Sequence, residues 1–216
     1  MKKYDAVIFD LDGTLLNTLD DLTDAVNHVM EQFNYPTHTI NEVRSFVGNG
    51  IKLLIERSLP YGADTPDFSK IFDAFKQYYT THCNIKTAPY NGIIDLLEML
   101  SSDGYDLAIV SNKNNAAVEN LNNIYFSKYI SIAIGESENV KKKPAPDTVL
   151  KALEILDCEK HRAIYVGDSD VDFKTAVNAG IDCVNVSWGF RERAFLETFN
   201  PTAIIDTPLE LKNYLI

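Results

Sequence analysis

Short apolar runs that are rich in β-forming residues recur along the chain. The first covers residues 4–10 and ends abruptly at an acidic turn that contains a glycine. Runs of this kind are typical of strands buried on both faces of a parallel sheet. The further candidate strands are residues 106–110, 131–134, 163–166, 183–186 and 203–205. Because most of them follow a helical pattern, the sequence predicts an α/β fold, a Rossmann-like parallel sheet with helices on both faces.

A long stretch between the first and second predicted strands has helical periodicity only. It covers residues 16–85, and its first helix is expected to begin at Thr18 as N-cap, with Asp21 completing a variant of the capping box. Apolar residues then follow at helical spacing, which predicts packing faces. We therefore expect a helical domain, residues 16–85, inserted into an α/β core of residues 1–15 and 86–216.

Composition and charge narrow the class of partner. The chain is 45% hydrophobic and 24% charged, as in ordinary globular proteins, and it has no apolar run of the roughly 18 residues that a membrane span needs. Its formal net charge of −11 argues against sequence-independent binding of nucleic acid, which requires lysine and arginine. An anionic substrate would therefore need a metal ion and a few well-placed lysines. We expect neither nucleic acid nor membrane as a partner.

The first ten residues and the cysteines indicate the compartment. Two lysines and an apolar run resemble the start of a secretory signal, but aspartates interrupt the run, which favours a cytoplasmic location. The cysteines are odd in number, far apart and without a CxxC pair, so neither a disulfide framework nor a zinc site is indicated. They are Cys83, Cys158 and Cys183.

The first acidic turn is the most informative segment. Asp10 and Asp12 stand one residue apart at the end of a strand, before Gly13. Close carboxylates repel each other unless a cation lies between them, and oxygen-rich clusters suit Mg²⁺. Taken alone, such a segment is more often simply a turn.

A second acidic cluster follows the strand predicted at residues 163–166. It contains Asp168, Ser169 and Asp172. The carboxyl ends of parallel strands converge at one edge of a sheet, so Asp168 can complete a magnesium site begun by Asp10. The alternative is that Asp168 and Asp172 only cap the next helix, where an acid is favourable in any case.

Two further segments can supply groups that bind an anion. Ser111 and Asn112 follow the strand predicted at residues 106–110, and a helix beginning there would offer N–H donors to an anion, although Ser111 by itself is an ordinary N-cap. Lys143 precedes a proline, and a helix is expected to begin near Pro146. A rigidly presented lysine can neutralise phosphate charge.

These four segments together resemble the four motifs of the haloacid dehalogenase superfamily. They read DLDGTLLNT, VSN, KKKPAPD and VGDSDVD, in the family's order and spacing, over essentially the whole chain. The form is similar to the phosphoglycolate phosphatase-like branch. The resemblance implies a Mg²⁺-dependent phosphatase that acts on a small phosphorylated metabolite, with phosphoglycolate as the substrate that the analogy suggests.

The resemblance also implies roles for individual residues. Asp10 would be the nucleophile, and Asp12 the acid that protonates the leaving alcohol and then activates water. Mg²⁺ would be held by the carboxylates of Asp10 and Asp168 and by the backbone carbonyl of Asp12. Ser111 and Lys143 would hold the phosphoryl oxygens, with Lys143 also restraining the nucleophile.

Supporting roles follow from the same resemblance. Asp172 would support the metal site without binding the ion directly, with Ser169 beside it. Gly13 and Thr14 would shape the turn, where backbone amides add donors, and Asn112 would lie near the substrate beside Ser111. The dehalogenase branch of the superfamily lacks a carboxylate at the position of Asp12, so cleavage of a carbon–halogen bond is disfavoured here.

The helical insertion resembles a mobile cap that closes over the active site. In the related phosphatases, the segment that corresponds to residues 47–50 faces the substrate, which implies substrate contacts for Gly48, Asn49 and Gly50, with Arg44 nearby. An interhelical turn and a surface cation are the plainer interpretations. Residues 187–191, with the single tryptophan, either line the rim of the site or anchor a loop.

Other functions remain open from the sequence. A β-phosphoglucomutase-like phosphomutase, a pyrophosphatase or a nucleotidase would use the same fold. A phospho-accepting signalling module also holds Mg²⁺ in acidic clusters, but such modules are about half as long and have no helical insertion. The chain is expected to be a monomer or a homodimer.

Overall fold

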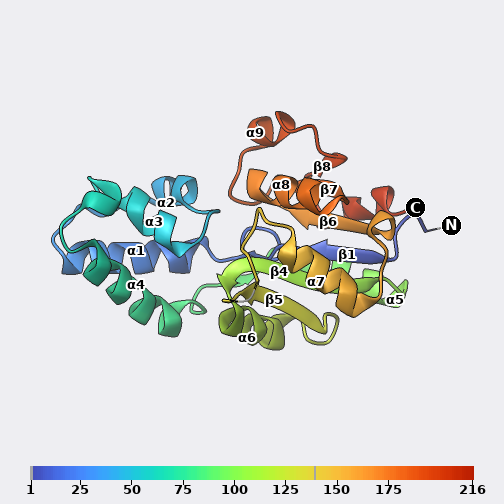
Figure 1. The fold of residues 1–216 in the computed structure, drawn as a ribbon, viewed down its shortest axis with the longest axis horizontal. Coiled ribbons are helices and arrows are strands. Elements are labelled where there is room, and N and C mark those ends of the chain that lie inside the picture. Colours follow the sequence, from blue (N-terminus) through green and yellow to red (C-terminus); the bar gives the residue numbers. More distant parts are fainter. Residues whose placement is uncertain (1, 139) are drawn as a thin grey trace. The chain divides into compact units, whose positions relative to one another are not determined.

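The computed structural model describes residues 2–138 and 140–216 (Figure 1). The chain forms two compact units. The first contains the residues up to Leu16 together with Pro89–Ile216, and the second is Asn17–Ala88.

A six-stranded parallel sheet forms the centre of the first unit. Its strand order is β5-β4-β1-β6-β7-β8, so the first strand of the chain lies in the middle. The strands are β1 (Ala6–Phe9), β4 (Asp106–Asn114), β5 (Ile132–Glu136), β6 (Ala163–Gly167), β7 (Asp182–Val186) and β8 (Ala203–Ile205). Each neighbouring pair is parallel, which confirms the predicted Rossmann-like sheet.

Helices cover both faces of this sheet. On one face, α5 and α6 pack on Val7 and Phe9 of β1, and on the other face α7 and α8 pack on Ala6 and Ile8. The helices of this unit are α5 (Ile93–Ser102), α6 (Asn115–Tyr125), α7 (Asp147–Leu156), α8 (Asp170–Ala179) and α9 (Arg193–Glu197), with 3₁₀ turns at Lys160–Arg162 and Pro208–Tyr214. Because alternate residues of a strand point to opposite faces, an uninterrupted apolar strand serves both cores.

The register of the central strands places the candidate residues at one edge. Phe9, the last residue of β1, lies beside Ile109 of β4 and Val166 of β6. The residues that come directly after Phe9, Ile109 and Val166 therefore lie at the same level of the sheet. In parallel α/β sheets the ligand site lies at this carboxyl edge, where the strand order reverses.

The second unit is helical. It consists of α1 (Leu19–Gln32), α2 (Ile40–Phe46), α3 (Ile51–Ser58) and α4 (Phe68–His82), with a 3₁₀ turn at Gly62–Asp64. Its core includes Val26, Leu54, Ile71 and Phe75, all almost fully buried. A second, two-stranded sheet pairs β2 (Leu16–Asn17) with β3 (Ala88–Pro89).

The expected capping box at the start of α1 is wrong. Thr18 is the N-cap residue, but its side chain makes no capping hydrogen bond. Asp21 instead accepts hydrogen bonds from the backbone N–H groups of Ile85, Lys86 and Thr87. The Asp21 carboxylate is buried, and a buried charge is stabilised there only where hydrogen-bond donors replace the water that it loses. The capping-box pattern is a local one, whereas the hydrogen-bond donors to Asp21 lie 64 to 66 residues away.

Over the described residues, none of the helices has both the length and the apolar character required to traverse a bilayer.

Candidate active site

Lys143 and Asp10 form the centre of the candidate site. Asp10 directly follows β1, and its backbone N–H bonds to the carbonyl of Val166 on β6. The Nζ atom of Lys143 lies 2.6 Å from Oδ1 of Asp10 and 2.7 Å from Oδ1 of Asp172. All three side chains are almost completely buried, so this ion-pair network is shielded from solvent.

Asn112 holds the backbone of Lys143. Its Oδ1 accepts the N–H of Lys143 at 2.7 Å, and its Nδ2 donates to the carbonyl of Lys143 at 3.0 Å. This two-point clamp fixes the residue from which the lysine side chain extends. The structure therefore engages the amide of Asn112 in positioning Lys143.

Gly13 makes the turn after Asp10 fit against Asp168. Its φ of 93° lies in the region that favours glycine, and a Cβ atom there would overlap the carboxylate of Asp168. Thr14, which follows, is fully buried, and its hydroxyl has no hydrogen-bond partner among the described residues. The turn thus brings the first and last acidic segments into direct contact.

Three carboxylates converge at this edge, as expected for parallel strand ends. One oxygen each from Asp10, Asp168 and Asp172 lies within 4.8 Å of the others, and all three residues are buried. Burial and the charge of Asp172 raise the pKa of Asp10 to about 7, against the opposing effect of Lys143. Burial and the neighbouring carboxylates also raise the pKa of Asp168. Burial is the larger cause of both shifts, and repulsion among three carboxylates that share one lysine adds to it.

Lys143 has the opposite shift. Burial by itself lowers the pKa of a lysine, but the charges of Asp10 and Asp172 outweigh it and raise the pKa of Lys143 above its usual value. The ammonium group is therefore charged at every physiological pH. It is a permanent cation beside the oxygen atoms of Asp10.

The donor set fits a magnesium ion held by Asp10 and Asp168. Oδ1 of Asp172 accepts from Lys143 and Tyr165, and its Oδ2 accepts from the backbone and hydroxyl of Ser169. Within the described ranges, Oδ2 of Asp10 and Oδ1 of Asp168 accept no hydrogen bond. Two hard oxygens in a surplus of negative charge suit a divalent cation.

Ser111 lies at the same edge of the sheet, but no helix begins there. The residue is buried, and β4 continues through it to Asn114, whose side chain is the N-cap of α6. The expected helix N-terminus at Ser111 is therefore wrong, because pairing with β5 extends the strand to Asn114. The hydroxyl oxygen of Ser111 accepts the N–H of Lys113 at 3.1 Å, which leaves its proton available to an anion.

The segment after β7 contacts both acidic turns of the site. From the sequence alone, its role as a rim or as a loop anchor was left open. The indole N–H of Trp188 donates to the carbonyl of Thr14 at 3.0 Å, and the N–H of Phe190 donates to Oδ2 of Asp168 at 2.6 Å. A Cβ atom on Gly189 would overlap Asp168 and lie 2.5 Å from the carbonyl of Gly13. The sequence signal for this segment was the Trp-Gly-Phe stretch that follows a strand. Its two interpretations, a rim of the site and an anchor for a loop, both place these residues at this edge of the sheet.

Asp12 pairs with a lysine that sequence analysis gave no role. The Nζ atom of Lys113 lies 2.9 Å from Oδ1 of Asp12, and the side chains are 7% and 20% exposed, respectively. Asp12 is thus the more accessible of the two aspartates in the first turn, since the Asp10 side chain is 8% exposed.

The residues predicted for substrate contact in the insertion belong to the second unit. Gly48 and Gly50 have φ values of 113° and 88°, in the turn between α2 and α3. The guanidinium of Arg57 donates to the carbonyl of Phe46 at 2.6 Å and to Oδ1 of Asn49 at 2.9 Å. This arginine braces the turn from within the helical unit.

Arg44 is exposed on α2. Its role in substrate binding, like that of Gly48, Asn49 and Gly50, stays a prediction.

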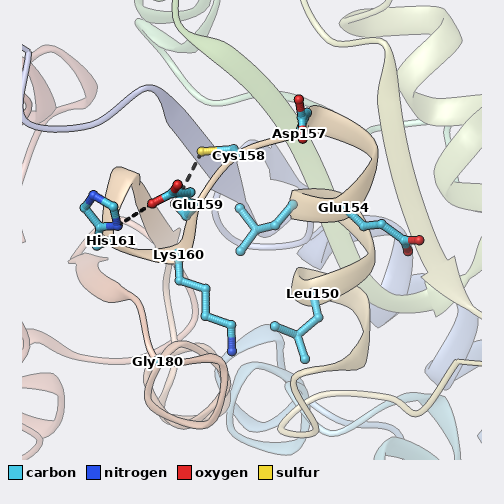
Figure 2. Close-up of a pocket in the computed structure, with 9 residues that line it drawn as sticks. Leu150, Glu154, Asp157, Cys158, Glu159, Lys160, His161 and Gly180 are labelled. Atoms are coloured by element: carbon cyan, nitrogen blue, oxygen red, sulfur yellow. Dashed lines mark hydrogen bonds and ion pairs between the residues drawn. The ribbon is translucent and has the colours of Figure 1, made fainter.

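A hollow of about 630 Å³ lies elsewhere in the first unit (Figure 2). It is lined by the end of α7, the 3₁₀ turn before β6 and Gly180 after α8. These segments precede β6 and β7, so the hollow lies at the amino ends of those strands, opposite the carboxylate cluster. At its rim, Nδ1 of His161 lies 3.1 Å from the carboxylate of Glu159, and both side chains are exposed.

Comparisons with known proteins agree with this fold. The family model of the haloacid dehalogenase-like hydrolases matches residues 7–186. The phosphoglycolate phosphatase of Mesorhizobium japonicum is 32% identical over 203 residues, which cover 92% of this chain and 89% of that protein. A crystal structure of a protein from Lactobacillus delbrueckii subsp. bulgaricus is 35% identical, with a TM-score of 0.94 over 99% of both chains. The structure of CbbY from Rhodobacter sphaeroides in complex with phosphate is 25% identical, with a TM-score of 0.75 over 96% of each chain.

A parallel α/β fold with paired aspartates and a buried lysine at the strand ends defines the class of protein. The chain belongs to the haloacid dehalogenase-like hydrolase family. Its membership and its phosphatase relatives confirm the predicted class of enzyme, a phosphoric monoester hydrolase.

Proposed function

We propose that this protein is a Mg²⁺-dependent phosphatase that hydrolyses a small phosphorylated metabolite through a phosphoaspartate on Asp10. The observation that carries the proposal is the placement of Lys143, whose Nζ lies 2.6 Å from Asp10 inside a cluster of three buried carboxylates. A nucleophilic carboxylate needs a fixed orientation, and a transferring phosphoryl group needs nearby positive charge.

In the first step, an oxygen of Asp10 attacks phosphorus. An aspartyl–phosphate bond forms while the bond between phosphorus and the alcohol oxygen breaks. Asp12 gives its proton to the departing oxygen, so that the product leaves as the neutral alcohol. Lys143 and the hydroxyl of Ser111 would hold the oxygens of the phosphoryl group as charge shifts among them.

In the second step, water attacks the phosphorus of phosphoaspartate. Asp12, now a carboxylate, takes a proton from that water, the aspartyl–phosphate bond breaks, and inorganic phosphate forms. The carboxylate of Asp10 is restored, and the proton returns to Asp12. Both steps balance with water as the only co-substrate.

Asp10 and Asp168 would hold the magnesium ion, with the backbone carbonyl of Asp12. When bound, the ion supplies charge neutralisation between the nucleophile and the anionic substrate. Asp172 and Ser169 act as supporting groups, because Asp172 is already bonded by Lys143, Tyr165 and Ser169. Removing the ion would leave the carboxylates to repel both each other and the substrate.

Phosphoglycolate is the proposed substrate. The proposal is supported by the phosphoglycolate phosphatases among the relatives, which cover most of both chains, and by the phosphate-bound relative of the same fold. We place substrate selection in the helical unit, at Arg44 and the turn of Gly48, Asn49 and Gly50. The phosphoryl group itself would be bound and transferred by residues of the first unit.

Hydrolysis of p-nitrophenyl phosphate with and without Mg²⁺ tests the reaction. We expect wild type to require the ion and Asp10→Asn to lose at least about 10³-fold in kcat, since it removes the nucleophile. Asp95→Asn, on the exposed surface of α5, is the matched control and keeps full activity. Undiminished turnover by Asp10→Asn would contradict the nucleophile assignment.

Product analysis tests the substrate. Release of inorganic phosphate is compared for phosphoglycolate, hexose phosphates, pyrophosphate and nucleoside monophosphates. We expect the highest kcat/KM for phosphoglycolate. Isomerised hexose phosphate without free phosphate would instead identify a phosphomutase.

A further inference from the structure

Asp12 and Lys113 form an ion pair that the mechanism above does not use. Lys113 Nζ lies 2.9 Å from Oδ1 of Asp12, and the lysine side chain is 7% exposed. The two residues come from different strand ends, 101 positions apart. Two lysines are thus assigned to the two aspartates of the first turn, Lys143 to Asp10 and Lys113 to Asp12.

An irregularity in the sheet directs Lys113 toward Asp12. The register of β4 against β5 shifts between Val110 and Asn114. A β-bulge re-aims side chains that would otherwise alternate across the strand. Within the shifted stretch, Lys113 reaches Asp12 at the end of the neighbouring strand β1.

The backbone of Lys113 is held in place on two sides. Its N–H donates to the hydroxyl of Ser111 at 3.1 Å. Its carbonyl lies so close to Gly135 that a Cβ atom there would stand 2.6 Å away. The N–H of Gly135 donates to Oδ1 of Asn115 at 2.8 Å, which fixes this approach of β5. The ammonium group therefore extends from a fixed point.

We propose that Lys113 is a positioning residue that holds the carboxyl group of Asp12 for proton transfer; the inference rests on the acid–base role proposed for Asp12. With Oδ1 bound to the ammonium, Oδ2 carries the proton that passes to the leaving oxygen and returns from water. Asp12 is only two residues from Asp10, and a free carboxylate there could turn toward the metal cluster. A misplacement of about 1 Å can cost roughly 10²-fold in rate.

The leaving group distinguishes this role from a general contribution of charge. An alkyl phosphate needs its departing oxygen protonated, whereas p-nitrophenolate leaves with little help. The parameter kcat/KM reports the steps up to formation of phosphoaspartate, so it isolates the acid role. A residue that merely stabilises the fold would affect both substrates equally.

The test compares Lys113→Met and Lys113→Arg on phosphoglycolate and p-nitrophenyl phosphate. For Lys113→Met we expect kcat/KM to fall about 10- to 100-fold on phosphoglycolate and less than about 3-fold on the aryl ester. Lys113→Arg, which keeps a cation at this position, restores most of the activity. Lys142→Met, at an exposed lysine on the loop between β5 and α7, is the matched control and behaves as wild type.

Equal losses on both substrates, or no loss on either, would overturn the proposal, provided that thermal unfolding shows the variant to be folded. Equal losses would make Lys113 a phosphoryl-binding cation. Asp12→Asn is measured in parallel, so that failure of the role of Lys113 can be distinguished from failure of the role of Asp12. If Asp12→Asn discriminates between the substrates and Lys113→Met does not, only the role of Lys113 fails; if neither discriminates, the role of Asp12 fails as well.

Discussion

Lys143 Nζ lies 2.6 Å from Oδ1 of Asp10, although the two residues are 133 positions apart. The same ammonium group contacts Asp172 at 2.7 Å and Tyr165 at 3.0 Å. One buried cation therefore joins segments that follow β1, β5 and β6. Both the charge balance of the site and the packing of these segments depend on it.

Replacing Lys143 with Met should harm stability as well as activity. Without the ammonium, Asp10 and Asp172 are buried without their counter-ion, and breaking such a pair costs about 3–5 kcal/mol. We expect urea unfolding of the metal-free protein to show this loss, together with loss of phosphatase activity. Lys151→Met, in a half-exposed pair with Glu154, is the control and changes stability by less than about 1 kcal/mol. A fully stable Lys143→Met protein would contradict the role of the ion pair.

Magnesium should stabilise the folded protein. A ligand that binds only the native state at about 100 times its Kd adds about 2.7 kcal/mol to the free energy of unfolding. We therefore expect the melting temperature to rise with Mg²⁺ and fall back with a chelator. Asp168→Asn should abolish most of the rise, whereas Asp95→Asn on the surface of α5 should retain it. Equal responses of wild type and Asp168→Asn would remove Asp168 from the metal site.

Gly189→Ala should weaken magnesium binding. The added Cβ would overlap Asp168 and crowd the carbonyl of Gly13, so the carboxylate must move. We expect the Kd for Mg²⁺, measured by calorimetry, to rise at least about 10-fold, equivalent to about 1.4 kcal/mol. Gly62→Ala serves as the control, since it adds backbone strain at a φ of 55° in the second unit without altering the metal ligands.

Trp188→Phe is a milder change in the same loop. It removes the indole N–H that donates to the carbonyl of Thr14. The expected cost is about 1 kcal/mol of stability.

An unchanged Kd for Mg²⁺ in Gly189→Ala would contradict the prediction for that variant, since it would show that the loop can move without displacing Asp168.

Asp21 should make the helical unit sensitive to acid. Burial favours the neutral carboxyl, but the hydroxyl of Thr87 and the N–H groups of Lys86, Thr87 and Ile85 outweigh it and lower the pKa of Asp21. A carboxyl with a lowered folded-state pKa stabilises the protein above its unfolded pKa of about 3.9. That contribution is lost as the pH falls through the lowered value.

Asp21→Asn should therefore lose about 1–3 kcal/mol at pH 7, because one oxygen that accepts N–H bonds becomes a donor. The gap from wild type should close once the pH falls below the lowered pKa of Asp21, where the wild-type carboxyl is protonated. Urea titrations at several pH values measure this directly. Asp24→Asn, which breaks only a half-exposed pair with Lys86, is the matched control with a small effect. A gap that persists in acid would mean that packing, and not ionisation, accounts for the loss.

Much of the fold could be predicted from the sequence. Apolar runs such as residues 163–166 predict the six parallel strands, because a strand that is buried on both faces is apolar at every position. Capping at Thr18 and the supposed helix start at Ser111 were wrong, since local motifs compete with partners that lie far along the chain. Asp21 accepts hydrogen bonds from the loop at Ile85–Thr87, and β4 extends past Ser111 because it pairs with β5.

The sequence by itself determined which chemical groups stand at the strand ends: the acids after β1 and β6, the serine after β4 and the lysine that precedes Pro144. Their pairing was decided only by the tertiary structure, which assigns Lys143 to Asp10 and Asp172 and Lys113 to Asp12. The physical reason is that a hydrogen bond depends on distances of a few tenths of an ångström. Strand register, a bulge in β4 and the close approach of Gly13 to Asp168 set those distances, and none of these is encoded in a short stretch of residues.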